Sequence, residues 1–290
     1  MIKTSRQLKD KIKNLTGGDS KKSQILTRKY IMERFLARVA KSKYRYNFIL
    51  KGGMLVSAIV GENARSTMDI DATVRALPLT ANDIKAIIEE ITSIDLSDNL
   101  NFEITDAKEI MEEHDYSGMR ITMKVMLETI RETITFDIST GDAITPSAMT
   151  FSYPMMFEQG EINILTYSLE TLLAEKLETI LARATTNTRM RDFYDIHTLW
   201  NFDENLIKTD VLREAYFATT QKRQTEHLID DAEQILDDIA NSEHMALMWS
   251  NYRNSNNYVG ELEWDDVFKT AQHIVLDEIA ITDGFALTMV

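Results

Sequence analysis

The chain has 290 residues, a formal net charge of −14, 44% hydrophobic residues and no cysteine. This length buries a sizeable core and divides naturally into two domains. The lack of cysteine excludes a disulfide scaffold and fits a reducing compartment, and no apolar stretch is long enough for a membrane span or a signal peptide, so we expect a cytoplasmic protein without a membrane partner.

The first 51 residues are strongly basic. They carry fifteen Lys or Arg against three acids, a net charge of 15 − 3 = +12. Apolar residues at helical spacing predict one helix that ends at Gly17 and a longer one over residues 23–43. A basic arm is the electrostatic pattern expected of a protein that binds a nucleic acid. The alternative is a pair of solvated helices whose lysines serve solubility or contact the acidic half of the chain.

A glycine turn follows these helices. The apolar residues 48–50 precede Gly52 and Gly53, and the apolar residues 54–60 follow them, so the pattern predicts strand, turn and helix. A helix N-terminus preceded by glycines suits a phosphate, because its N–H groups are unpaired and no Cβ blocks the approach. The nucleotide-binding candidates in this stretch are Lys51, Gly52, Gly53, Ser66 and Thr67. The two hydroxyls equally suit capping of the turn that precedes the next strand.

Two aspartates, Asp69 and Asp71, lie at the start of that next apolar strand. Residues i and i+2 of a strand share a face, so the two carboxylates converge while Ile70 points to the other face. Converging carboxylates beside a phosphate site suit Mg²⁺, which binds one or two carboxylates together with substrate phosphates. The pair alone is common in an acidic chain, so the argument depends on the order of the elements.

This order resembles the nucleotidyltransferase core of the DNA polymerase β superfamily. The resemblance extends over roughly residues 48–200 and implies a site for a nucleoside triphosphate. The chain departs from the superfamily pattern at one point. Met54 follows Gly53 where many members have serine, so a phosphate contact from that hydroxyl is missing.

Residues 81–93 have helical spacing, and three β-like runs follow at 101–105, 119–128 and 133–139, the last two suited to a hairpin. Asp137 lies in the third run, where a carboxylate is costly to bury without a cation or hydrogen-bond donors. The resemblance implies a third carboxylate that holds a second metal ion and helps deprotonate the attacking hydroxyl, and Asp137 fits that role. As alternatives, Asp137 caps the turn that follows, and Asp142 is interpreted as a turn residue.

Residues 146–160 are interpreted as an irregular connection and 161–167 as a last strand. Ser168 can cap a helix in which Lys176 lies amid the apolar stripe, with Arg183 one heptad further on. Glu175 and Glu178 fall on the opposite face. A core-facing lysine must snorkel, pair with an acid or meet an anion, and the resemblance implies that this lysine binds the triphosphate.

The segment RMRDFYDIHTLW, residues 189–200, predicts another helix with Asp192 within its buried stripe and Asp195 at the edge. We prefer Asp192 as the functional acid, paired with Lys176 or helping to fix the nucleotide, and take Asp195 second. Arg189 and Arg191 are candidates for phosphate or RNA contacts, with a solvated helix start as the alternative. The Arg-Asp-aromatic-x-Asp pattern resembles the last motif of the AbiEii/AbiGii toxin family of type IV toxin–antitoxin and phage abortive-infection systems.

The remainder of the chain predicts helices at 206–219, 226–239, 244–252 and 264–279. From residue 168 onward ten Lys or Arg face twenty-three acids, a net charge of 10 − 23 = −13. This acidic half could restrict the path of a nucleic acid or bind a basic protein, and the sequence does not separate the two.

We therefore expect an α/β protein with a nucleotidyltransferase-like mixed sheet core at 1–167 and an α-helical C-terminal domain at 168–290. The resemblance implies transfer of a nucleoside monophosphate from an NTP, with GTP and CTP both open as donors, to a hydroxyl such as the 3′ end of a tRNA. The expected cofactor is Mg²⁺, held by Asp69, Asp71 and Asp137. The expected biological effect is growth arrest countered by an antitoxin.

Other functions stay open. The site could serve a nucleotide-binding regulator without transfer, although three candidate acids are more than a phosphate sensor needs. The chain could also act as an interaction protein through its acidic helical half. Nucleotidylation of an antibiotic is a further alternative, and the basic N-terminal arm favours a polyanionic acceptor over a cationic drug.

Overall fold

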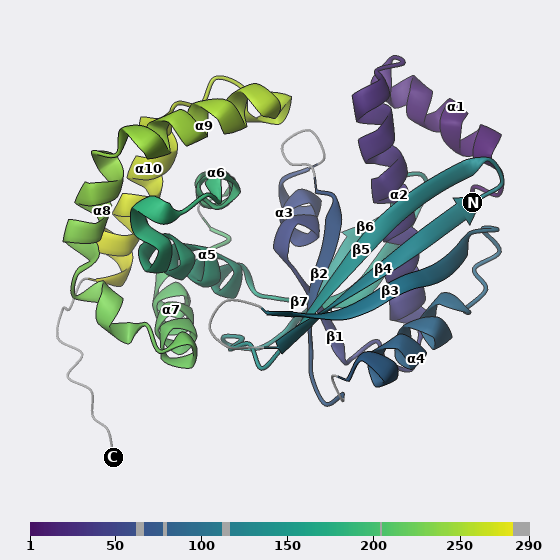
Figure 1. The fold of residues 1–290 in the computed structure, drawn as a ribbon, viewed down its shortest axis with the longest axis horizontal. Coiled ribbons are helices and arrows are strands. Elements are labelled where there is room, and N and C mark those ends of the chain that lie inside the picture. Colours follow the sequence, from purple (N-terminus) through teal and green to yellow (C-terminus); the bar gives the residue numbers. More distant parts are fainter. Residues whose placement is uncertain (62–66, 78–79, 112–116, 204, 281–290) are drawn as a thin grey trace. The chain divides into compact units, whose positions relative to one another are not determined.

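The computed structural model describes residues 1–61, 67–77, 80–111, 117–203 and 205–280. The chain divides into two compact units. The first comprises Met1–Asp142 with Ala148–Tyr167, and the second comprises Ala143–Ser147 with Ser168–Val290. The predicted fold class is confirmed, because a mixed sheet with helices forms the first unit and helices form the second (Figure 1).

The first unit is organised around a seven-stranded sheet with the order β3-β4-β5-β2-β1-β7-β6. Its central pairs β2–β5 and β1–β7 are parallel, whereas β1–β2 and the outer pairs are antiparallel. The predicted hairpin is present as β4 and β5. The strands are β1 Phe48–Lys51, β2 Asp69–Val74, β3 Asn101–Met111, β4 Ser117–Leu127, β5 Ile130–Thr140, β6 Met149–Pro154 and β7 Glu161–Thr166.

The alternation of burial along β5 shows how the two faces of the sheet differ. Ile134, Phe136 and Ile138 are buried, while the intervening Thr135 and Asp137 are only half-buried. Helix α2 packs on the apolar face, where the rings of Phe35 and Phe136 lie 5.1 Å apart between centroids. The opposite face of the central strands therefore carries the polar side chains.

Four helices belong to the described part of this unit, and the second, third and fourth begin within three residues of their predicted positions. Helix α1 ends at a left-handed Gly17, as predicted. Thr4, Asp19 and Thr80 cap the N-termini of α1, α2 and α4 through their side chains. The helices are α1 Ser5–Thr16, α2 Ser20–Lys41, α3 Gly52–Val60 and α4 Ala81–Thr92.

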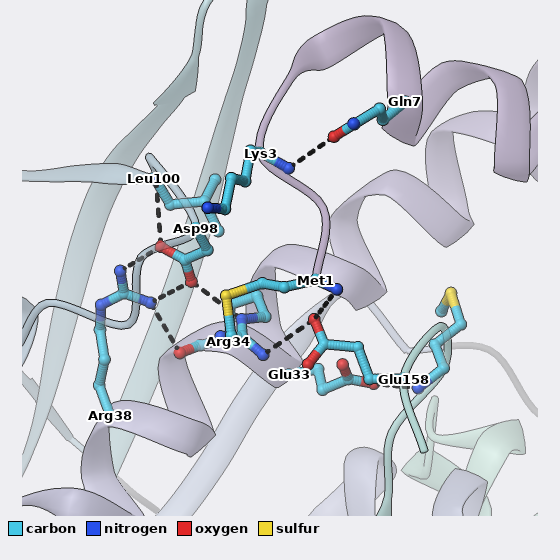
Figure 2. Close-up of polar contacts among 10 residues, drawn as sticks. Met1, Lys3, Gln7, Glu33, Arg34, Arg38, Asp98, Leu100 and Glu158 are labelled. Atoms are coloured by element: carbon cyan, nitrogen blue, oxygen red, sulfur yellow. Dashed lines mark hydrogen bonds and ion pairs between the residues drawn. The ribbon is translucent and has the colours of Figure 1, made fainter. Parts of the chain in front are cut away.

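Helix α2 carries a buried ion cluster at its centre. Arg34 donates to Asp98 at 2.9 Å, and Arg38 donates to both oxygens of the same carboxylate at 2.7 and 2.9 Å (Figure 2). All three side chains are buried. These two arginines of the basic arm therefore stabilise the fold and are not available to a nucleic acid. The exposed basic residues of the arm are Lys3, Arg6, Lys9, Lys11, Lys13, Lys21, Lys22, Lys41, Lys43 and Arg45.

The expectation of an irregular connection over residues 146–160 is wrong in part, because Met149–Pro154 forms strand β6 and pairs with β7. This strand lies at the edge of the sheet, and Tyr153 is its buried side chain. An edge strand with little burial lacks the apolar alternation from which strands are recognised.

The second unit is helical, and Ser168 caps its first long helix, α5, as predicted. The predicted helix over 226–239 is interrupted, since a short 3₁₀ turn at Glu226–Ile229 precedes α8. The helices are α5 Leu169–Arg183, α6 Met190–Trp200, α7 Thr209–Arg223, α8 Ala232–Ala240, α9 Glu243–Ser255 and α10 Trp264–His273, which continues as a π-helical turn at Ile274–Ile279.

The face of α5 opposite the predicted apolar stripe is covered as well. Glu178 on this face is fully buried and accepts hydrogen bonds from Arg223 and Thr225. Helix α7 and the turn after it cover this side of α5, so the charge is paired inside the unit. None of the helices in the described part of the chain is long and apolar enough to cross a membrane.

Candidate active site

The glycine turn wraps around Asp71. Helix α3 begins at Gly52, two residues earlier than predicted, and Gly52 has a left-handed φ of 65°. A Cβ at this position would lie 2.2 Å from Oδ2 of Asp71. The N–H of Gly53 donates a hydrogen bond to the same carboxylate. Glycine at position 52 is therefore required both by the backbone conformation and by the close approach of Asp71.

Asp69 and Asp71 project from the same face of β2, and the intervening Ile70 is fully buried on the other face. Thr135 on β5 donates to Oδ1 of Asp69. Burial raises the pKa of Asp71; Lys51 opposes this shift, and the neighbouring Asp137 and Asp69 add to it. The surroundings of Asp71 thus disfavour its negative charge, which is the condition that a bound cation relieves.

Strand register extends this pair into a row of charged residues. Lys51 on β1 lies opposite Asp71, Asp71 lies beside Asp137 on β5, and Asp137 lies opposite Arg120 on β4. Residues paired in register share a face of the sheet. Asp71 and Asp137 are therefore neighbours on adjacent strands, with one cation at each end of the row. Asp69 lies two residues before Asp71 on the same face of β2, in register with Thr135.

The carboxylate of Asp137 is engaged by Arg120, a residue that the sequence analysis did not single out. Nε and an Nη of Arg120 donate to the two oxygens of Asp137 at 2.7 and 2.5 Å. This hydrogen bonding, together with the charges of the nearby aspartates, raises the pKa of the guanidinium.

In the described ranges of the chain, no group of three His, Cys, Asp or Glu side chains is arranged to hold a metal ion.

Lys51 is fixed by Asp142, which the sequence analysis interpreted as a turn residue. Oδ2 of Asp142 accepts hydrogen bonds from Lys51 Nζ at 2.8 Å, Tyr167 at 2.5 Å and Ser139 at 2.7 Å. Burial alone would raise the pKa of Asp142, but Lys51 and the two hydroxyls hold it below its usual range. No local sequence pattern reveals this role, because the partners come from three separate segments.

Of the two hydroxyls proposed before β2, Thr67 is buried and donates to the backbone carbonyl of Asp69 at 3.3 Å. This contact matches the capping alternative for Thr67. Ser66 lies outside the described residues.

In the second unit, Lys176 contacts both candidate acids of α6. Its Nζ lies 2.6 Å from Asp192 Oδ1 and 2.8 Å from Asp195 Oδ2, and all three side chains are buried. Burial lowers the pKa of the lysine, but the two carboxylates outweigh it and the net shift is upward. The sequence favoured pairing of Lys176 with Asp192, and the structure adds Asp195 as an equal partner.

Two arginines lie near this triad. Arg189 donates to the second oxygen of Asp192 at 2.8 Å and is about half exposed. Burial and the positive charge of Arg189 lower the pKa of Arg183. Arg191 is exposed at the start of α6. Positive charge therefore accumulates at this end of the triad, as in a site that receives an anion.

The predicted site residues thus form one group in each unit. The first unit holds Lys51, Gly52, Gly53, Thr67, Asp69, Asp71 and Asp137, and the second holds Lys176, Arg183, Asp192 and Asp195. Asp142 and Arg120 join the first group on structural grounds.

A family model matches most of the chain. The profile of the family described as "Nucleotidyl transferase AbiEii toxin, Type IV TA system" matches residues 34–270. None of the curated protein sequences compared with this chain matches it.

Two solved structures from Helicobacter pylori are similar to this chain over most of its length. A candidate nucleotidyltransferase has a TM-score of 0.47 and 16% identity, covering 88% of this chain and 96% of its own. The protein JHP933 has a TM-score of 0.48 and 15% identity, covering 88% of this chain and 93% of its own.

Proposed function

The chain belongs to the AbiEii nucleotidyltransferase toxin family of type IV toxin–antitoxin systems, and from this premise we propose that it transfers a nucleoside monophosphate from an NTP to a hydroxyl of an RNA, releasing pyrophosphate. The observation that carries the proposal is the register of Asp71 beside Asp137, directly against the Gly52 turn. Phosphoryl transfer needs positioned carboxylates next to a binding site for the phosphates, and the contact between this turn and the acid pair supports the proposal.

The donor set suits Mg²⁺. Asp69 and Asp71 share a face of β2, and burial together with neighbouring carboxylates raises the pKa of Asp71. A hard divalent cation bound by these two oxygen donors and by substrate phosphates would relieve that repulsion. When bound, the ion supplies charge neutralisation at the transferred phosphoryl group.

The triphosphate is assigned to the start of α3 and to Lys51. The N-cap residue of α3, Lys51, makes no side-chain capping hydrogen bond, and the N–H of Gly53 bonds to Asp71. The other N–H groups of the first turn are the donors that we assign to the triphosphate. Asp142 holds the ammonium of Lys51 beside this turn. On the family resemblance, Lys176 and Arg183 also serve the nucleotide, with Asp192 and Asp195 orienting the lysine.

Asp137 is assigned to the attacking hydroxyl. It lies in register with Asp71 on the adjacent parallel strand, so its carboxylate can accept a proton beside the reacting phosphorus. An RNA acceptor is supported by the exposed lysines of α1 and of the first turn of α2, such as Lys9, Lys13 and Lys22. We further propose that the RNA is a tRNA and that a dedicated antitoxin is the partner of this protein. We also propose that the two domains comprise residues 1–167 and 168–290.

The test is transfer of label from each α-³²P-NTP, with Mg²⁺, onto total bacterial RNA. We compare the wild type with Asp71→Asn and with Asp106→Asn, an exposed aspartate of β3 in the same sheet. Label on tRNA-sized RNA from one preferred NTP, lost in Asp71→Asn and kept in Asp106→Asn, supports the proposal. Label on protein or on small molecules alone overturns the RNA acceptor.

A second result would overturn transfer itself. If no label appears on any acceptor while the NTP still binds in a Mg²⁺-dependent manner, the site acts as a nucleotide sensor. Lysine-to-glutamine changes at Lys9, Lys13 and Lys22 test the acceptor surface separately. They should weaken RNA binding and reduce its salt dependence, by about 0.7 in the log–log slope for each RNA phosphate that is no longer neutralised.

A further inference from the structure

Arg120 donates hydrogen bonds to both oxygens of Asp137, the carboxylate that the superfamily resemblance assigns to a second metal ion. Its Nε and Nη donors lie 2.7 and 2.5 Å from Asp137 Oδ1 and Oδ2. Register places the two residues directly opposite each other on β4 and β5. The contact is therefore built into the sheet and needs no loop to maintain it.

This pair leaves Asp137 unable to serve two partners at once. In a bidentate pair, both carboxylate oxygens accept hydrogen bonds from the guanidinium. A metal ion must therefore displace the arginine from at least one of these oxygens. Consistent with this contact, Asp69, Asp71 and Asp137 do not form a three-acid metal site in the described residues. Asp137 is turned along the row toward Arg120.

The arginine can leave without unfolding the sheet. Its side chain is 42% exposed, whereas that of Asp137 is 14% exposed. An arginine at the solvent boundary loses little packing when it moves into water, and the half-buried carboxylate then needs another cation. An exchange of Arg120 for a metal ion is thus favoured where phosphate oxygens supply further ligands to the ion.

We propose that Arg120 is a positioning residue that occupies Asp137 in place of a second cation, so that the free protein takes up one ion at Asp69 and Asp71 and the second only with nucleotide. This inference rests on the proposed function and deepens it. Its consequence is that Asp137 has an oxygen available to the attacking hydroxyl only after nucleotide and the second ion have displaced Arg120, because the ion can be bound by the other oxygen alone.

The test measures how many Mn²⁺ ions each protein binds in the absence of nucleotide, and how tightly. Electron paramagnetic resonance reports the concentration of the ion that remains free. The variant is Arg120→Gln, and the matched control is Lys124→Gln, which alters an exposed cation on the same face of β4. Arg120→Gln should bind one more Mn²⁺ per chain, or bind the second ion at least about tenfold more tightly. Lys124→Gln should behave like the wild type, and circular dichroism should show all three proteins folded.

A double variant shows where the gained ion binds. Arg120→Gln with Asp137→Asn should lose the gain, since the competing carboxylate is then neutral. Equal Mn²⁺ binding by wild type and Arg120→Gln overturns the inference about Arg120, and so does a gain that survives in the double variant. Absence of Mn²⁺ binding in the wild type, with and without a non-hydrolysable NTP analogue, instead overturns the metal site of the proposed function, and this inference with it.

Discussion

Gly52 and Asp71 are in such close contact that a Cβ at position 52 would lie 2.2 Å from Oδ2 of the carboxylate. The turn between β1 and α3 is thereby tied to the strand that carries the acid pair. The turn that we propose for the phosphates is therefore in direct contact with the proposed metal ligand Asp71, and this has direct consequences for mutation.

Replacement of Gly52 by alanine should both strain the backbone and displace Asp71. Gly260→Ala is the matched control, because its φ of 64° nearly equals the 65° of Gly52 while nothing lies within 4 Å of its added Cβ. Chemical denaturation should show Gly52→Ala less stable than Gly260→Ala by about 1–3 kcal/mol, the cost of overpacking. If the two variants lose the same stability, the close approach of Asp71 to position 52 does not contribute to the cost of the substitution.

Asp142 should be essential for holding Lys51. Asp142→Asn removes the charge that accepts from Lys51, Tyr167 and Ser139. Because charge-assisted bonds contribute about 1.5–3 kcal/mol each, we expect a loss of about 2–4 kcal/mol at pH 7. Asp106→Asn is the exposed control and should change little.

The pH dependence provides a sharper check on the same residue. The pKa of Asp142 is lower in the folded protein than in the unfolded chain, so its contribution is present above about pH 3.9 and is lost as the pH falls below that value. The stability difference between wild type and Asp142→Asn should therefore shrink in acid. A difference that stays constant down to pH 2 would argue against the charged contact.

Substitution of Lys176 should lower the stability of the fold strongly, whatever the role of this lysine toward the nucleotide. Lys176→Met leaves Asp192 and Asp195 buried without their ammonium, which costs about 3–5 kcal/mol. Lys269→Met breaks an exposed pair with Asp265 and should cost at most about 1 kcal/mol. Urea denaturation of both variants measures the contrast, and similar small losses would refute the buried triad. Activity of Lys176→Met is informative only if the variant stays folded.

The buried Glu33 should make the free energy of unfolding fall as the pH rises. Its Oε2 accepts from the N–H of Met156 at 2.6 Å, and its Oε1 has no hydrogen-bond partner in the described structure (Figure 2). Burial raises the pKa of Glu33 to about 7, against an ordinary value of 4.5. The folded protein therefore holds a proton that the unfolded chain releases between these values, so the contribution is full below pH 4.5 and is lost as the pH rises through 7.

The measurement is the free energy of unfolding between pH 4.5 and 8 for wild type and Glu33→Gln. The glutamine keeps a carbonyl acceptor for Met156 and does not titrate, so the wild type should lose on the order of 1–3 kcal/mol relative to the variant. Glu103→Gln, an exposed change in the same unit, serves as control. Parallel profiles for all three proteins would contradict the raised pKa.

Much of the fold follows from periodicity in the sequence. The alternation around Ile70 predicts that Asp69 and Asp71 share one strand face, and the position of Ser168 before an apolar stripe predicts a helix cap. Both features depend on residues only a few positions apart. The edge strand β6 escaped prediction because it lacks buried alternation.

The partners of the site residues depend on contacts between distant segments. Arg120 meets Asp137 through the pairing of two strands, and Asp142 meets Lys51 across ninety-one positions of sequence. Arg34 and Arg38 count toward the basic arm in the sequence, but both are buried against their common partner Asp98. Composition alone does not tell whether a basic residue is solvated or buried against an acid.

The account is tested most directly by a crystal structure with Mn²⁺ and a non-hydrolysable NTP analogue, in which anomalous scattering locates the ion. We predict a Mn²⁺ peak between Asp69 and Asp71, with the triphosphate against the Gly52 turn and Lys51. Nucleotide bound elsewhere, or bound at the turn with no Mn²⁺ at these two aspartates, would contradict the proposed transferase site.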